Sequence, residues 1–337
     1  MEKKLPTIKE IARLLNISVS TVSRALHDHP SIGLKTKMEV KKLAEELKYV
    51  PNQTAIFFKQ GKTFTIGVIL PNLREEYFSL AISGIEEASF RNQYIALIGQ
   101  SHDDPEREKA IVESMKRHRV DGLLVSVTKE TSSLEHFEAL EQFKIPVVYF
   151  DRVPDAGNIH SVWCSLYHST IKCVDLLVKE GHKRIAYIQG PHTLTIKNER
   201  LEGYLNGLKK NKINTDPALM VTTDLSVEST QQAMEKLLSL KNRPTAVIAF
   251  NDYVALDAMR WARTHKIRIN KDITFVSYAN LPVTNYLETP PRASVEQFPF
   301  EQGERAANLL FKLIDSKGRE GSAPFENIIL NSELILH

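Results

Sequence analysis

The 337-residue sequence predicts an α/β protein with a small helical N-terminal domain and a larger core of two doubly wound, parallel-sheet subdomains. In residues 7–50, apolar residues recur at helical spacing. From residue 65 onward, short apolar runs alternate with longer amphipathic stretches, which is typical of a parallel sheet covered by helices on both faces. The same alternation restarts after residue 160. We therefore expect two such subdomains, one after the other.

The expected division of the chain has three parts. Residues 1–50 form the helical domain, residues 51–62 form a hinge helix and linker, and residues 63–337 form the core. Within the core, the expected N-terminal subdomain spans about 63–161 and 292–324, and the expected C-terminal subdomain spans about 162–291 and 325–337. A helix over 301–314 and two late strands near 327–335 are expected to cross back and tie the two halves together.

The first helix is expected to begin at Thr7. Thr7 and Glu10 have the spacing of a capping box. An apolar face at helical spacing follows, made by Ile8, Ile11, Ala12 and Leu15. Asn16 tolerates the left-handed conformation that ends a helix, and Ser18 can cap a second helix through its hydroxyl. The stretch therefore predicts two short helices joined by a tight turn.

The second helix carries small, polar and basic side chains around an inward-facing Val22. They are Ser20, Thr21, Ser23 and Arg24. A short helix with this surface suits the major groove of DNA, where hydroxyls and a forked guanidinium reach phosphates and base edges. The segment therefore indicates a helix-turn-helix motif that binds DNA. The alternative is an ordinary helical hairpin in a small domain.

A third amphipathic helix follows, with Gly33 as its N-cap. Its apolar face comprises Val40, Leu43, Ala44 and Leu47. We expect Pro51 to end this helix, and residues 52–58 to form a short extra helix closed by Gly61. Residues 1–62 hold 12 Lys and Arg against 6 Asp and Glu, a net charge of +6, whereas the rest holds 32 against 35, a net charge of −3. A basic head on a slightly acidic body favours binding to a polyanion.

The core elements follow in order. In the first half, the predicted strands are 65–70, 94–99, 122–127 and 147–150, and the predicted helices are 78–92, 105–118 and 134–143. In the second half, the predicted helices are 169–180, 197–208, 226–240 and 253–265, and the predicted strands are 184–189, 219–222, 246–250 and 274–278. Open parallel sheets bind ligands at the carboxyl ends of their strands. Two facing subdomains therefore predict a ligand cleft between them.

Composition is that of an ordinary globular protein, with 42% hydrophobic and 25% charged residues. The two cysteines, Cys164 and Cys173, do not make a disulfide framework. The first residues lead into a charged amphipathic helix instead of an apolar signal core. No apolar run approaches the roughly 20 residues that a bilayer-spanning helix needs. We therefore expect a cytoplasmic protein without a membrane partner.

These motifs carry a family resemblance. Residues 7–26, 36–52 and 66–68 closely resemble the lactose-repressor (LacI) family of bacterial transcription regulators, and so do the runs 104–108, 119–122, 181–186 and 250–252. The most specific runs are Thr21-Val22-Ser23-Arg24 and Tyr49-Val50-Pro51-Asn52. The likeness covers essentially the whole chain in the right order. It implies a helix-turn-helix head, a hinge helix and a core like that of periplasmic sugar-binding proteins.

The resemblance also implies a function. Such a regulator binds a pseudo-palindromic operator in double-stranded DNA, as a homodimer or a dimer of dimers, and most simply acts as a repressor. A small-molecule effector, a sugar or sugar derivative, binds in the cleft between the subdomains. By changing the angle between them, the effector would order or melt the hinge helix and so shift the affinity for DNA.

The resemblance assigns the DNA contacts residue by residue. Val19, Ser20 and Arg24 take positions that read base edges, where Val19 can meet a thymine methyl and Arg24 suits guanine. Ser18, Thr21 and Asn52 match phosphate-contacting or hinge positions. The expected DNA-binding set is completed by Thr7, Ser23, Ala55 and Phe58. Phe58 stands where the family places a leucine that wedges into the minor groove, and phenylalanine can do the same. Alternatively, Phe57 and Phe58 pack the hinge against the core.

The resemblance also assigns the effector contacts. Tyr77 and Phe78 match an aromatic pair that stacks on flat ligands in some relatives; the alternative is core packing at a helix start. Arg200 matches a ligand-contacting arginine that can hold hydroxyls or a carboxylate bidentately; the alternative is a surface ion pair with a neighbouring Glu. The expected effector set is completed by Asp151, Leu225, Asn251 and Ala279, of which Asp151 and Asn251 fall at strand ends facing the cleft.

Two departures from the family pattern concern the effector. The family usually has an Asp after the strand 275–278, where this chain has Ala279 and then Asn280. It also commonly has Asp-Asn a few residues after the strand near 160, where this chain has Ser165 and Leu166. A cleft without these two carboxylates offers fewer acceptors to a polyol. The departures therefore suggest an anionic effector, such as a sugar acid or a phosphorylated sugar, that would partner Arg200.

No motif predicts an enzyme, a cofactor or a metal site. We find neither a Gly-rich phosphate loop after a strand nor a Gly-x-Ser-x-Gly elbow. His160, Cys164 and His168 have metal-like spacing, but residues 159–163 are expected to end a strand, so the three side chains should diverge. Two further alternatives remain for the function. One is a solute-binding protein, and the other is a regulator whose effector is not a sugar.

Overall fold

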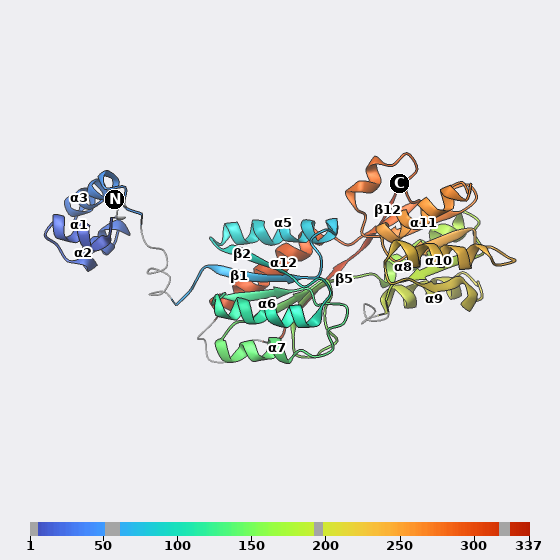
Figure 1. Cartoon of the computed structure of the whole chain (residues 1–337), viewed down its shortest axis with the longest axis horizontal. Coiled ribbons are helices and arrows are strands. Elements are labelled where there is room, and N and C mark those ends of the chain that lie inside the picture. Colours follow the sequence, from blue (N-terminus) through green and yellow to red (C-terminus); the bar gives the residue numbers. More distant parts are fainter. Residues whose placement is uncertain (1–5, 51–60, 192–197, 317–323) are drawn as a thin grey trace. The chain divides into compact units, whose positions relative to one another are not determined.

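The computed structural model describes residues 6–50, 61–191, 198–316 and 324–337. The chain forms two compact units, Met1–Thr63 and Phe64–His337. Helices make up the described part of the first unit, whereas the second contains two β-sheets covered by helices (Figure 1). Within the described ranges, no helix has both the length and the apolar character that crossing a membrane requires.

The N-terminal unit packs three helices around one small core. They are α1 (Ile8–Leu14), α2 (Val19–Leu26) and α3 (Leu34–Glu46). The core side chains without any solvent exposure are Ile11, Val22, Ala25 and Val40. Each helix contributes one apolar face to this cluster, as the helical spacing predicted.

The expected signals at the helix ends act as predicted. The Oγ1 atom of Thr7 accepts a hydrogen bond from the amide of Glu10 at 3.4 Å, and the Oγ atom of Ser18 accepts one from the amide of Thr21 at 3.0 Å. Asn16 has a φ of +53° and ends α1 in the left-handed conformation. The two-helix motif with its tight turn is therefore confirmed.

The end of α3 differs from the sequence-based expectation. Gly33 is the N-cap as predicted, but the helix ends at Glu46 instead of at Pro51. Lys48 has a φ of +52°, and the amide of Tyr49 bonds to the carbonyl of Ala44 at 2.8 Å. This left-handed cap turns the chain before the proline is reached. Pro51 and the expected helix 52–58 lie outside the described residues.

The first sheet of the core has six parallel strands in the order β11-β5-β4-β3-β1-β2. The strands are β1 (Thr65–Leu70), β2 (Ile95–Gln100), β3 (Gly122–Val125), β4 (Val147–Phe150), β5 (His160–Ser165) and β11 (Asn327–Asn331). The helices that belong to it are α5 (Glu76–Arg91), α6 (Pro105–Arg117), α7 (Glu135–Glu138, continued by a 3-10 turn over Ala139–Phe143) and α12 (Pro299–Asp315). Figure 1 shows α5 and α12 on one side of this sheet and α6 and α7 on the other.

The second sheet has six strands in the order β12-β10-β9-β8-β6-β7, and only β12 runs antiparallel to its neighbour. The strands are β6 (Ile185–Gln189), β7 (Met220–Thr222), β8 (Ala246–Ala249), β9 (Thr274–Tyr278), β10 (Ala293–Glu296) and β12 (Glu333–Leu336). Its helices are α8 (Tyr167–Lys179), α9 (Glu199–Lys210), α10 (Val227–Leu238) and α11 (Asp252–Thr264), with 3-10 turns over Pro217–Leu219 and Pro282–Tyr286. The prediction of two doubly wound subdomains is confirmed.

The chain crosses between these subdomains at places that differ from the expected limits. β5 pairs with β4, so the first crossing follows Ser165 instead of residue 161. β10, which the sequence analysis did not predict, pairs with β9, so the second crossing follows Glu296 instead of residue 291. β11 pairs with β5, so the third follows Asn331 instead of residue 324. The spacing of apolar residues predicts where an element begins. The pairing of strands decides to which sheet each strand belongs.

β2 differs from the expected pattern of strands covered on both faces. It lies at one edge of the first sheet, where Ile95 is 72% exposed and Ile98 is 40% exposed. Phe90, at the end of α5, is 75% exposed, and its carbonyl accepts a hydrogen bond from Gln93 at 3.0 Å in the turn that leads to β2. We call these uncovered apolar side chains the β2 patch: Phe90, Ile95, Leu97 and Ile98.

Two glycines allow α5 and α12 to pack closely. A Cβ atom on Gly84 of α5 would lie 2.0 Å from the carbonyl oxygen of Phe300, and one on Gly303 of α12 would lie 2.0 Å from the carbonyl oxygen of Ala81. Any side chain at either position would therefore force the helices apart. The close approach fixes the beginning of α5 relative to α12, and both contribute side chains to the pocket described below.

Candidate functional site

The first turn of α2 presents a polar surface to solvent. Ser18, Val19, Ser20 and Arg24 are exposed. The Ser18 hydroxyl lies 2.7 Å from that of Ser20 and 2.8 Å from that of Thr21. Positions 19, 20, 23 and 24 of a helix share one face, so the predicted base-reading and phosphate-contacting side chains lie side by side.

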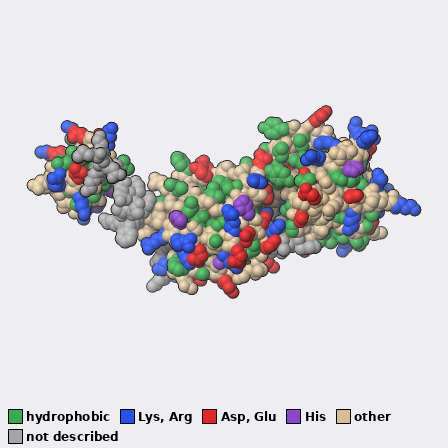
Figure 2. Space-filling model, in the orientation of Figure 1, with side chains coloured by type: hydrophobic (Ala, Val, Ile, Leu, Met, Phe, Trp, Pro, Cys, Tyr) green, Lys and Arg blue, Asp and Glu red, His purple; other side chains and the backbone are tan. Residues whose placement is uncertain are grey.

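Seven of the ten predicted DNA-binding residues lie in the described part of this unit. Thr7 is the exposed N-cap of α1, and Thr21 and Ser23 are half-buried on α2. Figure 2 shows Lys and Arg side chains on the surface of the N-terminal unit, as its net charge predicted. Asn52, Ala55 and Phe58 lie outside the described residues.

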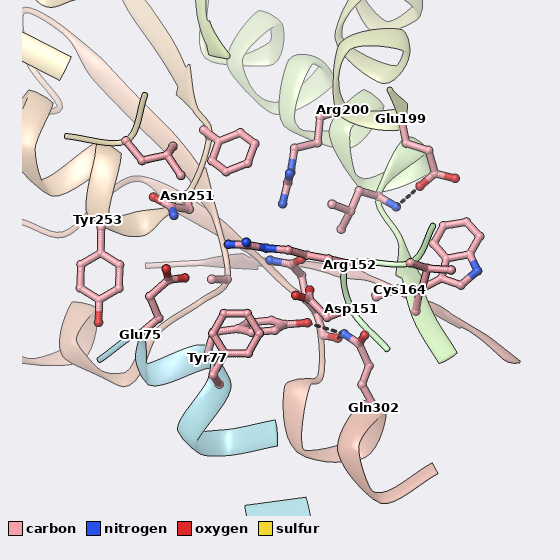
Figure 3. Close-up of a pocket in the computed structure, with 18 of the residues that line it drawn as sticks. Glu75, Tyr77, Asp151, Arg152, Cys164, Glu199, Arg200, Asn251, Tyr253 and Gln302 are labelled. Atoms are coloured by element: carbon pink, nitrogen blue, oxygen red, sulfur yellow. Dashed lines mark hydrogen bonds between the residues drawn. The ribbon is translucent and has the colours of Figure 1, made fainter. Parts of the chain in front are cut away.

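A pocket lies between the two subdomains of the core, with a cavity of about 180 Å³. All seven predicted effector residues line it: Tyr77, Phe78, Asp151, Arg200, Leu225, Asn251 and Ala279. Asp151, Asn251 and Ala279 come directly after or close to the carboxyl ends of β4, β8 and β9, which is where open parallel sheets bind ligands. Figure 3 shows side chains from both subdomains pointing into this space.

Asp151 is held in place by Ser126 and Tyr77. Ser126 donates a hydrogen bond to its Oδ2 atom at 3.2 Å. The Tyr77 hydroxyl accepts a hydrogen bond from Gln302 at 2.7 Å (Figure 3) and interacts with Asp151 in turn. Burial raises the pKa of Asp151, and the positive charge of Arg152 offsets part of this rise. Burial, followed by the charge of Asp151, raises the pKa of Tyr77 well above its usual value. A carboxylate fixed in this way can accept a hydrogen bond from a ligand hydroxyl.

Tyr77 and Phe78 satisfy both interpretations of the aromatic pair. They are 7% and 1% exposed and belong to the main hydrophobic core, and they also line the pocket. Their rings meet edge to face, with centroids 5.5 Å apart. Core packing therefore fixes the orientation of two rings that form part of the pocket wall.

Arg200 points into the pocket between aromatic rings. Its Cζ atom lies 4.4 Å from the ring centroid of Phe250 and 5.0 Å from that of Tyr278. Its Nε atom is buried and has no hydrogen-bond acceptor among the described residues. A buried donor without a partner is costly. This guanidinium is therefore ready to donate to a ligand.

The alternative of a surface ion pair between Arg200 and the adjacent Glu does not fit the geometry. The carboxylate of Glu199 instead accepts hydrogen bonds from the amide of Leu166 at 2.7 Å (Figure 3) and from the hydroxyl of Ser165 at 3.2 Å. Glu199 therefore binds Ser165 and Leu166, the two residues that stand where the family pattern has Asp-Asn. Among the described residues, Arg200 has no ion pair.

Three pocket residues have an unusual backbone conformation. Asp151 has a φ of +58°, Leu225 of +75° and Ala279 of +100°. Leu and Ala rarely adopt positive φ because the Cβ atom clashes with the backbone. Such residues persist where the surrounding structure holds them, and they cluster at binding sites.

The pocket contains side chains of both charges, which bear on the charge of the effector. Ala279 and Leu166 do line the pocket without a carboxylate, as the two departures indicated. However, Glu75, Asp151 and Glu199 also line it, and Arg152 is paired with Asp103 at 2.6 Å. Three carboxylates thus accompany two arginines, Arg152 and Arg200, of which Arg152 is already paired. Because like charges repel, this set disfavours an anion more than a neutral ligand.

Glu75 is a pocket residue that the sequence analysis missed. It is the N-cap residue of α5, yet its side chain makes no capping hydrogen bond. It points into the pocket, where burial raises the pKa of its carboxyl, and the charge of Arg152 opposes this rise. The only signal in the sequence was its place beside Tyr77. Gln302 and Tyr253 were missed as well, because α12 and the first turn of α11 reach the pocket only after folding.

The described residues contain no group of three or more His, Cys, Asp or Glu side chains that could hold a metal ion. Of the three residues with metal-like spacing, His160 accepts a hydrogen bond from the amide of Glu326 at 3.2 Å, and Cys164 lines the pocket. Burial raises the pKa of the Cys164 thiol to about 12, so it is not a thiolate at neutral pH.

Residues 63–329 match periplasmic binding proteins and the sugar binding domain of the LacI family, and residues 7–52 match bacterial regulatory proteins of the lacI family. It is 30% identical over 329 residues to the probable HTH-type transcriptional regulator EndR of Paenibacillus polymyxa, which covers 96% of this chain and 95% of the relative. It is 29% identical over 306 residues to the repressor CytR of Escherichia coli K12, covering 90% and 88%.

Solved structures agree with the sequence matches. The crystal structure of the Lac repressor dimer bound to its operator and the anti-inducer ONPF has a TM-score of 0.83 with this chain, at 25% identity, and the match covers 98% of each chain. The match to the core family extends over most of the chain, and the head matches the same family. The chain therefore belongs to the LacI family of bacterial transcriptional regulators.

Proposed function

We propose that this protein represses transcription by binding a pseudo-palindromic DNA operator as a dimer, and that a small molecule in the pocket controls this binding. One observation carries the proposal. The same chain combines an exposed polar surface on α2 with a pocket whose wall contains Arg200, a donor without a partner among the described residues. The first feature suits DNA, and the second suits a ligand.

The DNA contacts are divided by chemistry. Arg24 donates to guanine, Val19 contacts a thymine methyl, and Ser20 reaches a base edge or phosphate. Four hydroxyls contact the phosphate backbone of the DNA, those of Thr7, Ser18, Thr21 and Ser23. The contacts of the hinge with the minor groove come from Asn52, Ala55 and Phe58. Phosphate contacts supply most of the affinity, and the base contacts supply the sequence preference.

The effector is a small, uncharged, hydroxyl-rich compound of the sugar class. Asp151 and Glu75 accept hydrogen bonds from its hydroxyls, and Arg200 donates to its oxygens. The aromatic walls, among them Phe78 and Phe250, cover the apolar face of its ring. The size supports this class, because about 180 Å³ is below the roughly 300–1,000 Å³ of sites for drug-sized ligands.

The dimer forms through the β2 patch. An exposed, apolar strand edge invites pairing with another chain and is rarely left uncovered. The Lac repressor structure that resembles this chain is a dimer bound to operator DNA. Two copies related by a two-fold axis present two heads to the two halves of a pseudo-palindrome.

Selection of DNA tests the proposal. The full-length protein is incubated at physiological salt with random-sequence double-stranded DNA, and bound fragments are sequenced. We expect one pseudo-palindrome to be enriched. Replacing Arg24→Met should relax the preference at one base pair in each half-site, worth about 1–3 kcal/mol. The exposed Arg13 of α1 supplies the matched control, and Arg13→Met should keep the preference.

Salt-sensitive binding without a preferred sequence would contradict the proposal, because the head would then be only a polyanion-binding domain. The protein would in that case be a solute-binding protein with a basic head. A panel of neutral sugars and sugar acids, tested by thermal shift, decides the effector class. Stabilisation by sugar acids alone would overturn the assignment of an uncharged effector.

A further inference from the structure

Positive charges gather at one edge of the second sheet. The strands β7, β6, β8, β9 and β10 run parallel, so their amino ends meet at the same edge. The segments that lead into these strands are 179–184, 209–216, 241–245, 263–273 and Arg292. We call these segments the basic edge. The pocket lies at the opposite edge, where the strands have their carboxyl ends.

The basic edge differs in charge from the rest of the core. It holds 13 Lys and Arg against 3 Asp and Glu, whereas the remainder of residues 63–337 holds 19 against 32. Figure 2 shows Lys and Arg side chains along the end of the second subdomain that lies away from the first. The slightly acidic core therefore carries one strongly basic surface.

The carboxylates of the basic edge are already paired within it. They are Asp216, paired with Arg184 at 2.9 Å, Asp272 with Arg268 at 2.6 Å, and Glu180 with Arg292 at 2.7 Å. Lys210 pairs with Asp175, just outside the edge, at 2.6 Å. The other cations of the edge are exposed and make no ion pair among the described residues; they include Lys183, Lys212, Lys241, Arg243, Lys266 and Lys271. These charges are therefore available to a partner.

Hydrogen bonds hold the loops of the basic edge together. The side chain of Arg184 donates to the carbonyl of Asn242 at 3.0 Å, and the amide of Thr245 donates to the carbonyl of Arg184 at 3.0 Å. The amide of Thr274 donates in turn to the carbonyl of Thr245 at 2.9 Å. The cations therefore lie on a fixed surface, and strands spaced about 4.8 Å apart make this surface roughly 20 Å long.

The chemistry of the basic edge suits a phosphate backbone better than a protein. None of its residues, all of which the structure describes, is an exposed large hydrophobic side chain. Protein interfaces, in contrast, depend on apolar or aromatic anchors at their centre. Duplex DNA carries about one charge per 1.7 Å, so about 20 Å of duplex offers roughly 12 phosphates. The exposed Asn214, Thr215 and Asn242 lie among the cations and can donate to phosphate oxygens as well.

We propose that the basic edge binds the phosphate backbone of double-stranded DNA without sequence preference, as a second DNA-binding surface besides the helical head. This inference goes beyond the proposed function, in which the core binds the effector and its partner copy. Once the head holds DNA, other segments of the same DNA molecule are present at a high effective concentration, so a weak, salt-sensitive contact is sufficient. The core thereby brings a second stretch of the DNA to the protein.

Lysine footprinting of the full-length parent protein tests where DNA lies. The protein is briefly acetylated at low salt, alone and with excess random-sequence duplex, and the modification of each lysine is measured by mass spectrometry. We expect Lys183, Lys241, Lys266 and Lys271 to react at least about threefold more slowly with DNA, because phosphates cover them. The exposed Lys144 and Lys172, outside the edge, should keep their rates. Raising the salt from about 50 mM to about 200 mM should abolish the protection.

A four-site variant tests whether the edge holds a second duplex. Its substitutions are Lys183→Gln, Arg243→Gln, Lys266→Gln and Lys271→Gln. The matched control loses four positive charges at exposed sites elsewhere in the core, through Arg74→Gln, Arg117→Gln, Lys144→Gln and Lys172→Gln. Protein bound to a duplex on beads is offered a second, fluorescent duplex. The four-site variant should recruit at least about fivefold less of it than the parent, because phosphate contacts supply the affinity, and the control should match the parent.

The outcomes separate the possible partners. Lysines of the edge that react equally fast with and without DNA at low salt would overturn the proposal. Protection by polyglutamate or by phosphatidylglycerol vesicles, but not by DNA, would overturn it in favour of an acidic protein or a membrane. Equal recruitment by the four-site variant and the control would show that the edge holds no second duplex. A failed selection of operator DNA would overturn the proposed function without altering the footprint of the edge.

Discussion

Two arginines of the pocket show how neighbours decide the role of a residue. Arg152 is paired with Asp103 at 2.6 Å and lies 5.7 Å above the ring of Phe78. The positive charge of Arg152 is therefore already paired with a carboxylate of the protein. Arg200 is held between the rings of Phe250 and Tyr278 and has no ion pair among the described residues. Its charge is therefore available for a ligand.

Substitution Arg200→Lys should weaken effector binding about 10–100-fold. A lysine keeps the charge but loses the planar pair of donors that holds two ligand oxygens at once, and a hydrogen bond to a charged group is worth about 1.5–3 kcal/mol. Calorimetric titration with whichever uncharged sugar stabilises the parent protein measures the loss. Arg117→Lys, at the far end of α6, should bind like the parent. Equal affinity of Arg200→Lys and the parent would show that Arg200 does not hold the ligand.

At the scale of elements, the caps of α1 and α2 were more predictable than the end of α3 or the pairing of strands. The caps Thr7, Asn16 and Ser18 act through their own local backbone, so sequence spacing is enough to find them. β10 contains only four residues, and its place in the sheet depends on its pairing with both β9 and β12. The position of β2 at the edge of its sheet could not be predicted either, because its sequence is apolar although the strand is exposed.

The cap of α2 separates helix stability from DNA binding. Ser18→Ala removes the acceptor for the amide of Thr21 and should cost about 0.5–2 kcal/mol. Amide hydrogen exchange across residues 19–26 of the full-length protein should accelerate accordingly. Ser18→Asp keeps a good cap, so exchange should stay slow, but its negative charge faces phosphate and should lower DNA affinity. If Ser18→Asp binds DNA as tightly as the parent, Ser18 does not approach the phosphates.

At the scale of the whole molecule, the sequence identified seven residues of the pocket wall but missed Glu75 and Tyr253. The seven predicted residues follow strands or match a family motif, so their convergence follows from the topology. Glu75 and Tyr253 could not be found this way. The direction of Glu75 depends on its not capping α5, and the contact of Tyr253 depends on how closely the two subdomains approach. Both are properties of the assembled core.

Disruption of the β2 patch should convert the dimer into a monomer. Replacing Ile95→Glu together with Ile98→Asp places two charges on an apolar edge that a partner would otherwise cover, and burying unpaired charges is strongly unfavourable. Sedimentation velocity at micromolar concentration should then give a mass near 38.3 kDa instead of twice that value. Phe143→Glu is the control, because Phe143 is 55% exposed but lies outside the patch, under Lys116. A monomer cannot place two heads on one pseudo-palindrome, so operator affinity should fall as well. If the double variant stays dimeric while the control does too, the two copies associate through another surface.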